Sequence, residues 1–249
     1  MMAIRRMNKY LAAALILVLL SACMKIDNFD APEGKISGRL IDKTTGQNIM
    51  LDQGESHIRI WEYSYSLNPE PQDLAVKMDG TYKNTKLFNG TYDMQPFDGS
   101  WWPAEIIQNV KIGKKGTVQD FEVIPYLHLE DFSLELNGLN LTMSCRLHAP
   151  VVTGMPNVVE IRPFLSLNQY CGNTNRIDYY YSDDYKIRLQ KPWSAIDDGT
   201  GYSRETYSVT VPVKAGYTYW CRMGAQVKNT FTNYNYSRIV KVTVPEDAE

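Results

Sequence analysis

Strict alternation between apolar and polar side chains marks the stretch LNLTMSCRL at residues 139–147. Because successive side chains of a strand point to opposite faces, this pattern is typical of a strand with one buried face. The odd-numbered residues would share that face. The alternation recurs at residues 207–213 and 240–244. No stretch beyond residue 23 shows a convincing 3.6-residue period, so we predict an all-β fold with little helix.

A first block of short alternating segments covers residues 35–125. Asn-Gly and Asp-Gly pairs separate several of them, and these pairs tolerate the positive φ that tight hairpins require. The expected strands are Lys35–Asp42, His57–Tyr63, Leu74–Met78, Gly90–Phe97, Glu105–Ile112 and Val118–Ile124.

A second block, residues 126–249, contains the clearest alternation, which also includes residues 217–227. Strands with one apolar face and turn signals between them form a β-sandwich. The fold predicted from the sequence is therefore two consecutive β-sandwich domains, at residues 35–125 and 126–249.

The first 22 residues have the pattern of an export signal. Three basic residues precede an apolar run at residues 11–20, far shorter than the roughly 20 residues that span a bilayer. LSAC at residues 20–23 then matches the bacterial lipobox. We expect cleavage before Cys23, transfer to its thiol of a diacylglycerol with palmitate-type acyl chains, and attachment to a membrane through that lipid. Residues 23–34 would form the lipidated tether.

The charge of the remaining chain argues against some partners. Residues 1–22 hold three of the 26 Lys and Arg and none of the 28 Asp and Glu, which leaves 23 basic against 28 acidic residues. Nucleic-acid binding calls for a basic surface, so we expect no nucleic-acid partner. The 17 tyrosines agree with a fold rich in strands.

Both blocks resemble known sandwich domains. GRLIDKTTG at 38–46, DGTY at 79–82 and GTY at 90–92 are similar to the carboxypeptidase-regulatory or prealbumin-like domain. YTY at 217–219 and the strand at 237–244 resemble the last two strands of a fibronectin type III or immunoglobulin-like domain. That second resemblance makes Tyr217 the candidate tyrosine corner.

The whole arrangement resembles a family of Bacteroidetes lipoproteins of unknown function that pair these two domains. The residues that carry it are Cys23, DNFDAP at 27–32, DGTYKNTKLF at 79–88 and FEVIPY at 121–126. The resemblance implies an outer-membrane, lipid-anchored protein, facing either side, that works with SusC/SusD-like nutrient importers in polysaccharide utilisation. It implies no catalytic residues.

From this resemblance we predict a non-catalytic accessory lipoprotein of a glycan-uptake system that binds carbohydrate. The alternative is a structural spacer or adhesin-like lipoprotein that mediates protein–protein contacts. An enzyme would need two acids or a histidine-centred group converging in a cleft.

Candidate catalytic and metal-binding residues are few. His57, His128 and His148 are the only histidines, and none has a second ligand at a short spacing such as H-x-x-x-H. The acidic pairs Asp183-Asp184 and Asp197-Asp198 lie in loop-like sequence, where solvated acids are the simpler interpretation. We therefore predict no enzymatic activity, no metal and no cofactor.

Three cysteines follow Cys23, at positions 145, 171 and 221. Cys145 and Cys221 both lie on the inward register of their strands and could form a disulfide across the second sandwich. The alternative is that both are buried thiols that act as small apolar side chains.

The aromatic residues give the only positive indication of a binding site. Trp101 and Trp102 follow a turn, and Trp61 and Tyr63 share the polar face of an expected strand. Indole and phenol rings can stack on sugars, so these four residues are the predicted ligand contacts. Tyr179–Tyr181 with Tyr185 form a second aromatic cluster. Packing between the domains is the alternative role for the tryptophans.

Overall fold

The structure is a computed structural model that describes residues 30–249 of the chain. Within it, Pro32–Glu249 form one compact unit. Cys23 and the predicted signal segment lie outside the described residues. Between residues 30 and 249, no helix is both long and apolar enough to cross a membrane.

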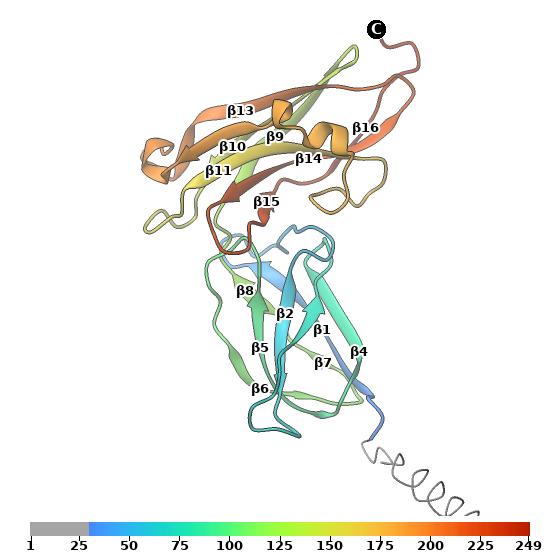
Figure 1. The fold of residues 1–249 in the computed structure, drawn as a ribbon, viewed down its shortest axis with the longest axis vertical. Helices are drawn as coiled ribbons and strands as arrows, with labels where there is room; N and C mark the ends of the chain where they lie inside the picture. Colours follow the sequence, from blue (N-terminus) through green and yellow to red (C-terminus); the bar gives the residue numbers. More distant parts are fainter. Residues whose placement is uncertain (1–29) are drawn as a thin grey trace, which may run out of the picture. The chain divides into compact units, whose positions relative to one another are not determined.

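Two facing sheets build the N-terminal domain (Figure 1). In one sheet, β1 pairs antiparallel with β4 and parallel with both β7 and β8. The other sheet has the order β3-β2-β5-β6. The strands are β1 (Gly34–Asp42), β2 (His57–Glu62), β3 (Gln72–Ala75), β4 (Thr81–Leu87), β5 (Gly90–Phe97), β6 (Ile107–Ile112), β7 (Thr117–Val118) and β8 (Phe121–Val123).

The C-terminal domain is a second pair of sheets (Figure 1). One has the order β13-β10-β9, and the other has the order β12-β11-β14-β15, with β16 also on β14. The elements are β9 (His128–Asn137), β10 (Asn140–His148), β11 (Val158–Ser166), β12 (Ile187–Lys191), β13 (Tyr202–Pro212), β14 (Thr218–Val227), β15 (Tyr234–Tyr236) and β16 (Val240–Thr243), with short 3₁₀ turns η1 (Asp178–Tyr181), η2 (Asp183–Tyr185) and η3 (Trp193–Ala195).

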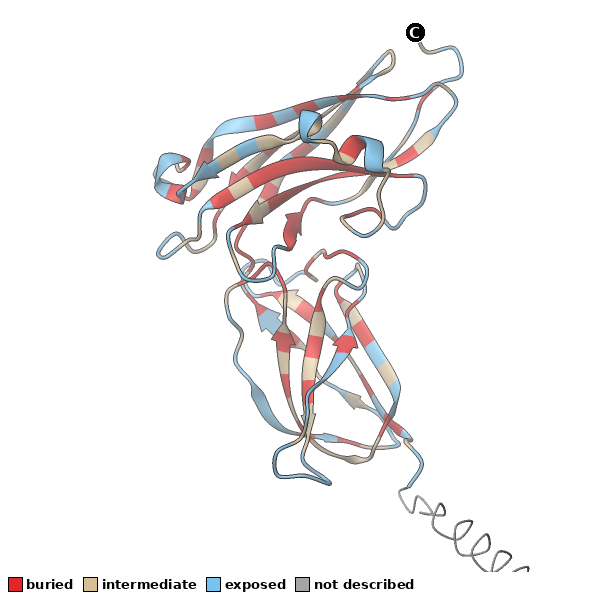
Figure 2. Cartoon of the chain, viewed as in Figure 1, coloured by how far each residue is buried: buried red, intermediate tan, exposed pale blue. Residues whose placement is uncertain are grey.

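Burial alternates along the strands as the sequence predicts (Figure 2). In β10 the buried face consists of the odd-numbered residues 141–147, opposite a polar face that carries hydroxyls. In β2, Ile58 and Ile60 are buried while the side chains between them are half exposed. These apolar faces form one core in each sandwich.

The all-β, two-sandwich fold class predicted from the sequence is confirmed. β5 has the predicted bounds, and the expected strand Val118–Ile124 is divided into β7 and β8. β4 was not among the expected strands, because its sequence TYKNTKL alternates over only a few residues. Its Tyr82 and Leu87 are buried, and its backbone completes the sheet beside β1.

Candidate functional site

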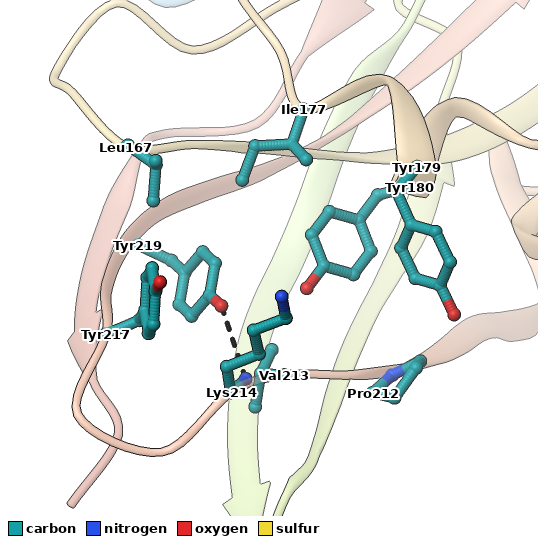
Figure 3. A pocket seen from close by; sticks show the side chains of 9 residues that line it. All are labelled: Leu167, Ile177, Tyr179, Tyr180, Pro212, Val213, Lys214, Tyr217 and Tyr219. Carbon is teal, nitrogen blue, oxygen red and sulfur yellow. Dashed lines mark hydrogen bonds between the residues drawn. The ribbon is translucent and has the colours of Figure 1, made fainter. Parts of the chain in front are cut away.

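A pocket of about 520 Å³ opens in the C-terminal domain, and tyrosines form much of its wall (Figure 3). We call it the tyrosine pocket. It lies where β13 ends and β14 begins, beside the segment that connects β11 to η1. Its lining residues are Leu167, Ile177, Tyr179, Tyr180, Pro212, Val213, Lys214, Tyr217 and Tyr219.

The turn η1 places the first two tyrosines. The backbone N–H of Ile177 donates to the carbonyl of Leu165 at 2.7 Å, so η1 begins directly against the end of β11. Tyr180 packs into the core, and its ring meets the ring of Tyr219 edge-on at 6.3 Å. Its neighbour Tyr179 therefore stays outside, with 60% of its surface exposed.

The start of β14 places the other two tyrosines of the pocket, Tyr217 and Tyr219. The Tyr219 hydroxyl accepts a hydrogen bond from the backbone N–H of Lys214 at 3.2 Å, and Cys221 follows two residues later. This is the tyrosine-corner contact, so its assignment to Tyr217 was wrong. Tyr217 precedes the strand, follows the turn at Gly216 (φ 75°), and is 46% exposed. The alternation at 217–227 suggested one continuous strand, but β14 begins after Tyr217.

Contacts hold both exposed rings in place. The Tyr185 hydroxyl donates to the Tyr179 hydroxyl at 3.0 Å, and the ring of Tyr217 stacks on that of Tyr219 with centroids 6.1 Å apart. Lys214 points into the pocket in Figure 3. The pocket thus combines fixed aromatic faces, phenol hydroxyls and an ammonium group, which suits a polar ligand with apolar C–H faces.

Burial, together with the neighbouring Tyr219 hydroxyl, raises the pKa of Tyr180 above its ordinary value. Tyr180 therefore serves as a buried wall of the pocket, with its hydroxyl beside that of Tyr219.

The structure places the two predicted tryptophans in different cores. Trp101 is 4% exposed within the N-terminal core, although it borders a hollow of about 240 Å³ beside Phe97 and Phe231, and its role as a ligand contact stays a prediction. Trp102 is half-buried against the C-terminal core, where its ring lies 5.1 Å from that of Tyr126. Adjacent residues of an extended segment point to opposite sides, so the pair reaches one core each. Packing between the domains, the alternative considered for them, describes Trp102, whereas Trp101 packs within the N-terminal core.

The other two predicted contacts lie in and just after β2. Trp61 is half-buried and faces Asp93 across the ladder with β5. Tyr63 is 42% exposed and follows the end of the strand. None of the pockets described for residues 30–249 includes either residue.

The three cysteines of the described chain are free and fully buried. Cys145 and Cys221 lie on the inward faces of β10 and β14, as predicted, but they form no disulfide in the structure. Burial raises the pKa of Cys145 to about 12, so it stays an inert thiol. The two residues act as small apolar core residues, the alternative considered for them.

The predicted loop acids make local contacts. Asp183 pairs with Lys186 and Arg188, and Asp198 accepts a hydrogen bond from Arg146 at 2.5 Å. Asp197 accepts backbone N–H groups of its own turn.

A cluster absent from the predictions lies on the outer face of β9 and β10. His128, Glu130 and His148 each offer one ligand atom, and these atoms all lie within 4.8 Å of one another. We call this group the histidine cluster. His128 Nδ1 lies 3.3 Å from His148 Nδ1 and 3.7 Å from Glu130 Oε1.

Short sequence spacing could not reveal the histidine cluster, because its histidines are 20 residues apart. A weaker signal was present. The apolar residues of this segment change from an odd position at Leu129 to an even one at Phe132, and the structure buries both, which indicates one extra residue between them. The hairpin register shows that bulge: Ser133 faces Ser144, but Glu130 faces Arg146 and His128 faces His148.

The junction between the two domains is the most deeply buried polar region. Arg222 is 0% exposed, and its guanidinium lies 3.6 Å above the ring of Tyr236. It donates to the carbonyl of Leu51 at 2.8 Å and lies 3.7 Å from the carboxylate of Asp52. Burial and the nearby Asp52 charge raise the pKa of Glu55 to about 7, although Tyr236 donates to its carboxyl group.

A second contact at the junction centres on Asn235. Its amide donates to the carbonyl of Ser100 at 2.8 Å and accepts from the Ser100 hydroxyl at 2.9 Å. The same side chain accepts from the backbone N–H of Leu127 at 3.1 Å. One asparagine thus ties a loop of the N-terminal domain to the segment that joins the domains.

Comparison with known families matches both domains. Residues 34–124 match the family described as "Protein of unknown function (DUF3823) N-terminal domain", and residues 127–241 match "Domain of unknown function (DUF3823_C)". No curated protein matches the chain.

Several solved structures share the fold. A DUF3823 family protein from Bacteroides uniformis is 23% identical with a TM-score of 0.70, and one from Parabacteroides merdae is 22% identical with a TM-score of 0.62. A third, also from Bacteroides uniformis, is named "putative carbohydrate binding protein" and is 21% identical with a TM-score of 0.67. Each comparison covers 86% of this chain and 100% of the other. At these identities the likeness shows the fold.

Proposed function

This chain belongs to the DUF3823 family, and from that premise we propose that it is a non-catalytic, carbohydrate-binding lipoprotein of the outer membrane. It would be anchored through Cys23 and would serve a SusC/SusD-like glycan importer. The tyrosine pocket of the C-terminal domain would hold the sugar.

The exposed rings of Tyr179 and Tyr217 carry this proposal. Leaving two large aromatic side chains in water forgoes the burial energy that each could contribute, about 1.5–3 kcal/mol for a side chain of such size. Both rings are nevertheless held by neighbouring tyrosines, so little rotamer freedom is left for a ligand to remove. Such rings can stack on the C–H face of a pyranose while hydroxyl and ammonium groups bind its oxygens. The carbohydrate-binding name of the Bacteroides uniformis relative agrees with this ligand class.

Affinity electrophoresis against a panel of polysaccharides tests the proposal. The sample is the compact unit Pro32–Glu249, compared with its Tyr179→Ala/Tyr217→Ala variant. We expect one glycan to retard the parent chain, and the double variant to lose at least about tenfold in affinity. The guide to this magnitude is the stacking of a nucleobase on an aromatic side chain, which contributes about 1–3 kcal/mol.

Tyr63→Ala is the matched control, because Tyr63 is a tyrosine of similar exposure in the other domain. It should bind like the parent. Retardation lost in Tyr63→Ala but kept in the double variant would move the site to the N-terminal domain. Absence of retardation by every glycan would contradict carbohydrate binding.

The buried polar junction favours a second candidate, a spacer that mediates protein–protein contacts. Arg222, Asn235 and Tyr236 donate hydrogen bonds from the C-terminal domain to the N-terminal domain, as a protein that positions its partners requires. A spacer would retain its partners in an outer-membrane pull-down when Tyr179 and Tyr217 are both alanine.

Anchoring through Cys23 has its own test. Metabolic labelling with palmitate should mark the native chain in the outer-membrane fraction. Cys23→Ala should remove both the label and the sedimentation with membranes. A labelled Cys23→Ala chain would contradict the proposed anchor.

A further inference from the structure

The histidine cluster has the donor set of a transition-metal site. Imidazole nitrogens and a carboxylate oxygen are the ligands that Zn²⁺ takes beside thiolates. In a tetrahedral site with Zn–N bonds of about 2.05 Å, two ligand nitrogens lie about 3.3 Å apart. His128 Nδ1 and His148 Nδ1 are 3.3 Å apart, and Glu130 Oε1 lies 3.7 Å from the first of them.

We propose that His128, His148 and Glu130 bind a divalent transition-metal ion, with Zn²⁺ the best match to their donor atoms. The site would take Nδ1 of each histidine and one carboxylate oxygen. Three protein ligands leave one tetrahedral position for water or for a ligand carried by another molecule.

Asp42 supports this assignment from the N-terminal domain. Its Oδ2 lies 2.7 Å from His128 Nε2, so that nitrogen carries the proton and Nδ1 is left with a lone pair. The carboxylate is itself fixed, because the backbone N–H and the hydroxyl of Thr44 donate to Oδ1 at 2.8 and 2.6 Å. A carboxylate on the distal nitrogen of a histidine is the usual outer partner of a metal ligand.

The ring of His148 is also oriented, and the cation opposite Glu130 in the ladder is bound to other groups. The ring of His148 stacks on that of Tyr202, with centroids 4.4 Å apart and planes at 17°. Arg146 faces Glu130 across the ladder, but its guanidinium donates to Asp198 at 2.5 Å and to the carbonyl of Ser203 at 2.8 Å. The carboxylate of Glu130 therefore does not have to give up an ion pair with Arg146 to bind a metal ion.

An ion can reach the cluster from solvent. His128 and Glu130 line a hollow of about 180 Å³ that also borders Asp42. Because Asp42 belongs to β1 and the ligands belong to β9 and β10, a bound ion would couple the two domains through one hydrogen bond.

Metal titration of the compact unit Pro32–Glu249 tests the proposal, after removal of any affinity tag and dialysis against a chelator. Zn²⁺ affinity is measured by competition with a chromophoric chelator, and Co²⁺ substitution reports the coordination geometry through its visible absorption. We expect a single equivalent to bind and the Co²⁺ bands to have the intensity of a four- or five-coordinate site.

The variants are Glu130→Gln, His148→Gln and Asp42→Asn. Each ligand variant should lower Zn²⁺ affinity at least about tenfold. Asp42→Asn should lower it about 10- to 100-fold while leaving the Co²⁺ spectrum similar, since Asp42 orients a ligand without being one. His57→Gln is the matched control, because His57 also pairs with a carboxylate at 2.7 Å but lies outside the cluster.

Unchanged circular dichroism of the metal-free variants ensures that a loss of affinity is a loss of ligands. Three results would overturn the proposal: no saturable binding of either ion, full affinity in both Glu130→Gln and His148→Gln, or an equal loss in His57→Gln.

Discussion

Tyrosines have different roles in the tyrosine pocket and at the junction between the domains. At the junction, Tyr236 is buried beneath a guanidinium and its hydroxyl donates to Glu55. In the pocket, the rings of Tyr179 and Tyr217 contact other tyrosines and are 60% and 46% exposed. The hydroxyls of Tyr179 and Tyr236 both have protein partners, so the exposed ring face is what makes an aromatic side chain available to a ligand.

Removing Arg222 should have the largest effect on stability. Arg222→Met deletes the only cation in contact with Asp52 among the described residues and leaves buried carboxyl groups without it. Loss of one partner of a buried pair costs about 3–5 kcal/mol of unfolding free energy. Urea unfolding measures this. The triple variant with Asp52→Asn and Glu55→Gln should recover most of the loss, and an unchanged midpoint for Arg222→Met alone would refute the assignment.

Trp101→Ala should cause the next largest loss of unfolding free energy. The side chain fills the N-terminal core, and replacing a buried Trp by Ala costs about 3–5 kcal/mol. Trp102→Ala should cost less because Trp102 is only half-buried. Thermal unfolding compares the two. Equal and small losses would mean that Trp101 does not support the N-terminal core.

The pH dependence of stability should come next, through Glu55. Its pKa rises from 4.5 to about 7 on folding, so the folded state keeps a proton that the unfolded state releases. The stabilisation is fully present below pH 4.5 and is lost as pH rises to about 7, by up to about 3 kcal/mol. Glu55→Gln should flatten that part of a urea-unfolding series. Parallel curves for the parent chain and the variant would rule out Glu55 as the source.

The tyrosine variants should have the smallest effect. Surface substitutions usually change unfolding free energy by about 0.5 kcal/mol or less. Tyr179→Ala and Tyr217→Ala remove exposed rings, so each should leave the urea midpoint nearly unchanged while glycan binding falls. A large loss of stability in either variant would mean that Tyr179 or Tyr217 is a packing residue like Tyr236, and that the pocket and the junction do not differ in this respect.

Alternation predicted the fold because it reports burial on one face, which is a local property of a strand. The inward faces of β10 and β14 followed from it directly. The site depends on properties that are not local. Trp101 and Trp102 follow a turn, but Trp101 packs into the N-terminal core and Trp102 packs against the C-terminal core, and neither contact can be read from the local sequence.

The tyrosine pocket was partly visible in the sequence. Tyr179–Tyr181 and Tyr185 stood out as a cluster, but Tyr217 joins them only because β13 and β14 bring a turn beside η1. The histidine cluster required the register of one hairpin, including its bulge, and residue spacing does not contain that register.

The pairing of β1 with β8 has a mechanical consequence. β1 is the first strand of the N-terminal domain and β8 the last, and Leu40–Asp42 run parallel to Phe121–Val123. Under the proposed anchoring, a pull on a bound polysaccharide enters at the start of β1 and leaves at the end of β8. Parallel strands pulled from opposite ends are loaded in shear, so their hydrogen bonds share the force instead of opening one by one. Single-molecule pulling between residues 32 and 249 should therefore find the β1–β8 domain resistant to extension, and a domain that yields at low force would show that tension takes another path.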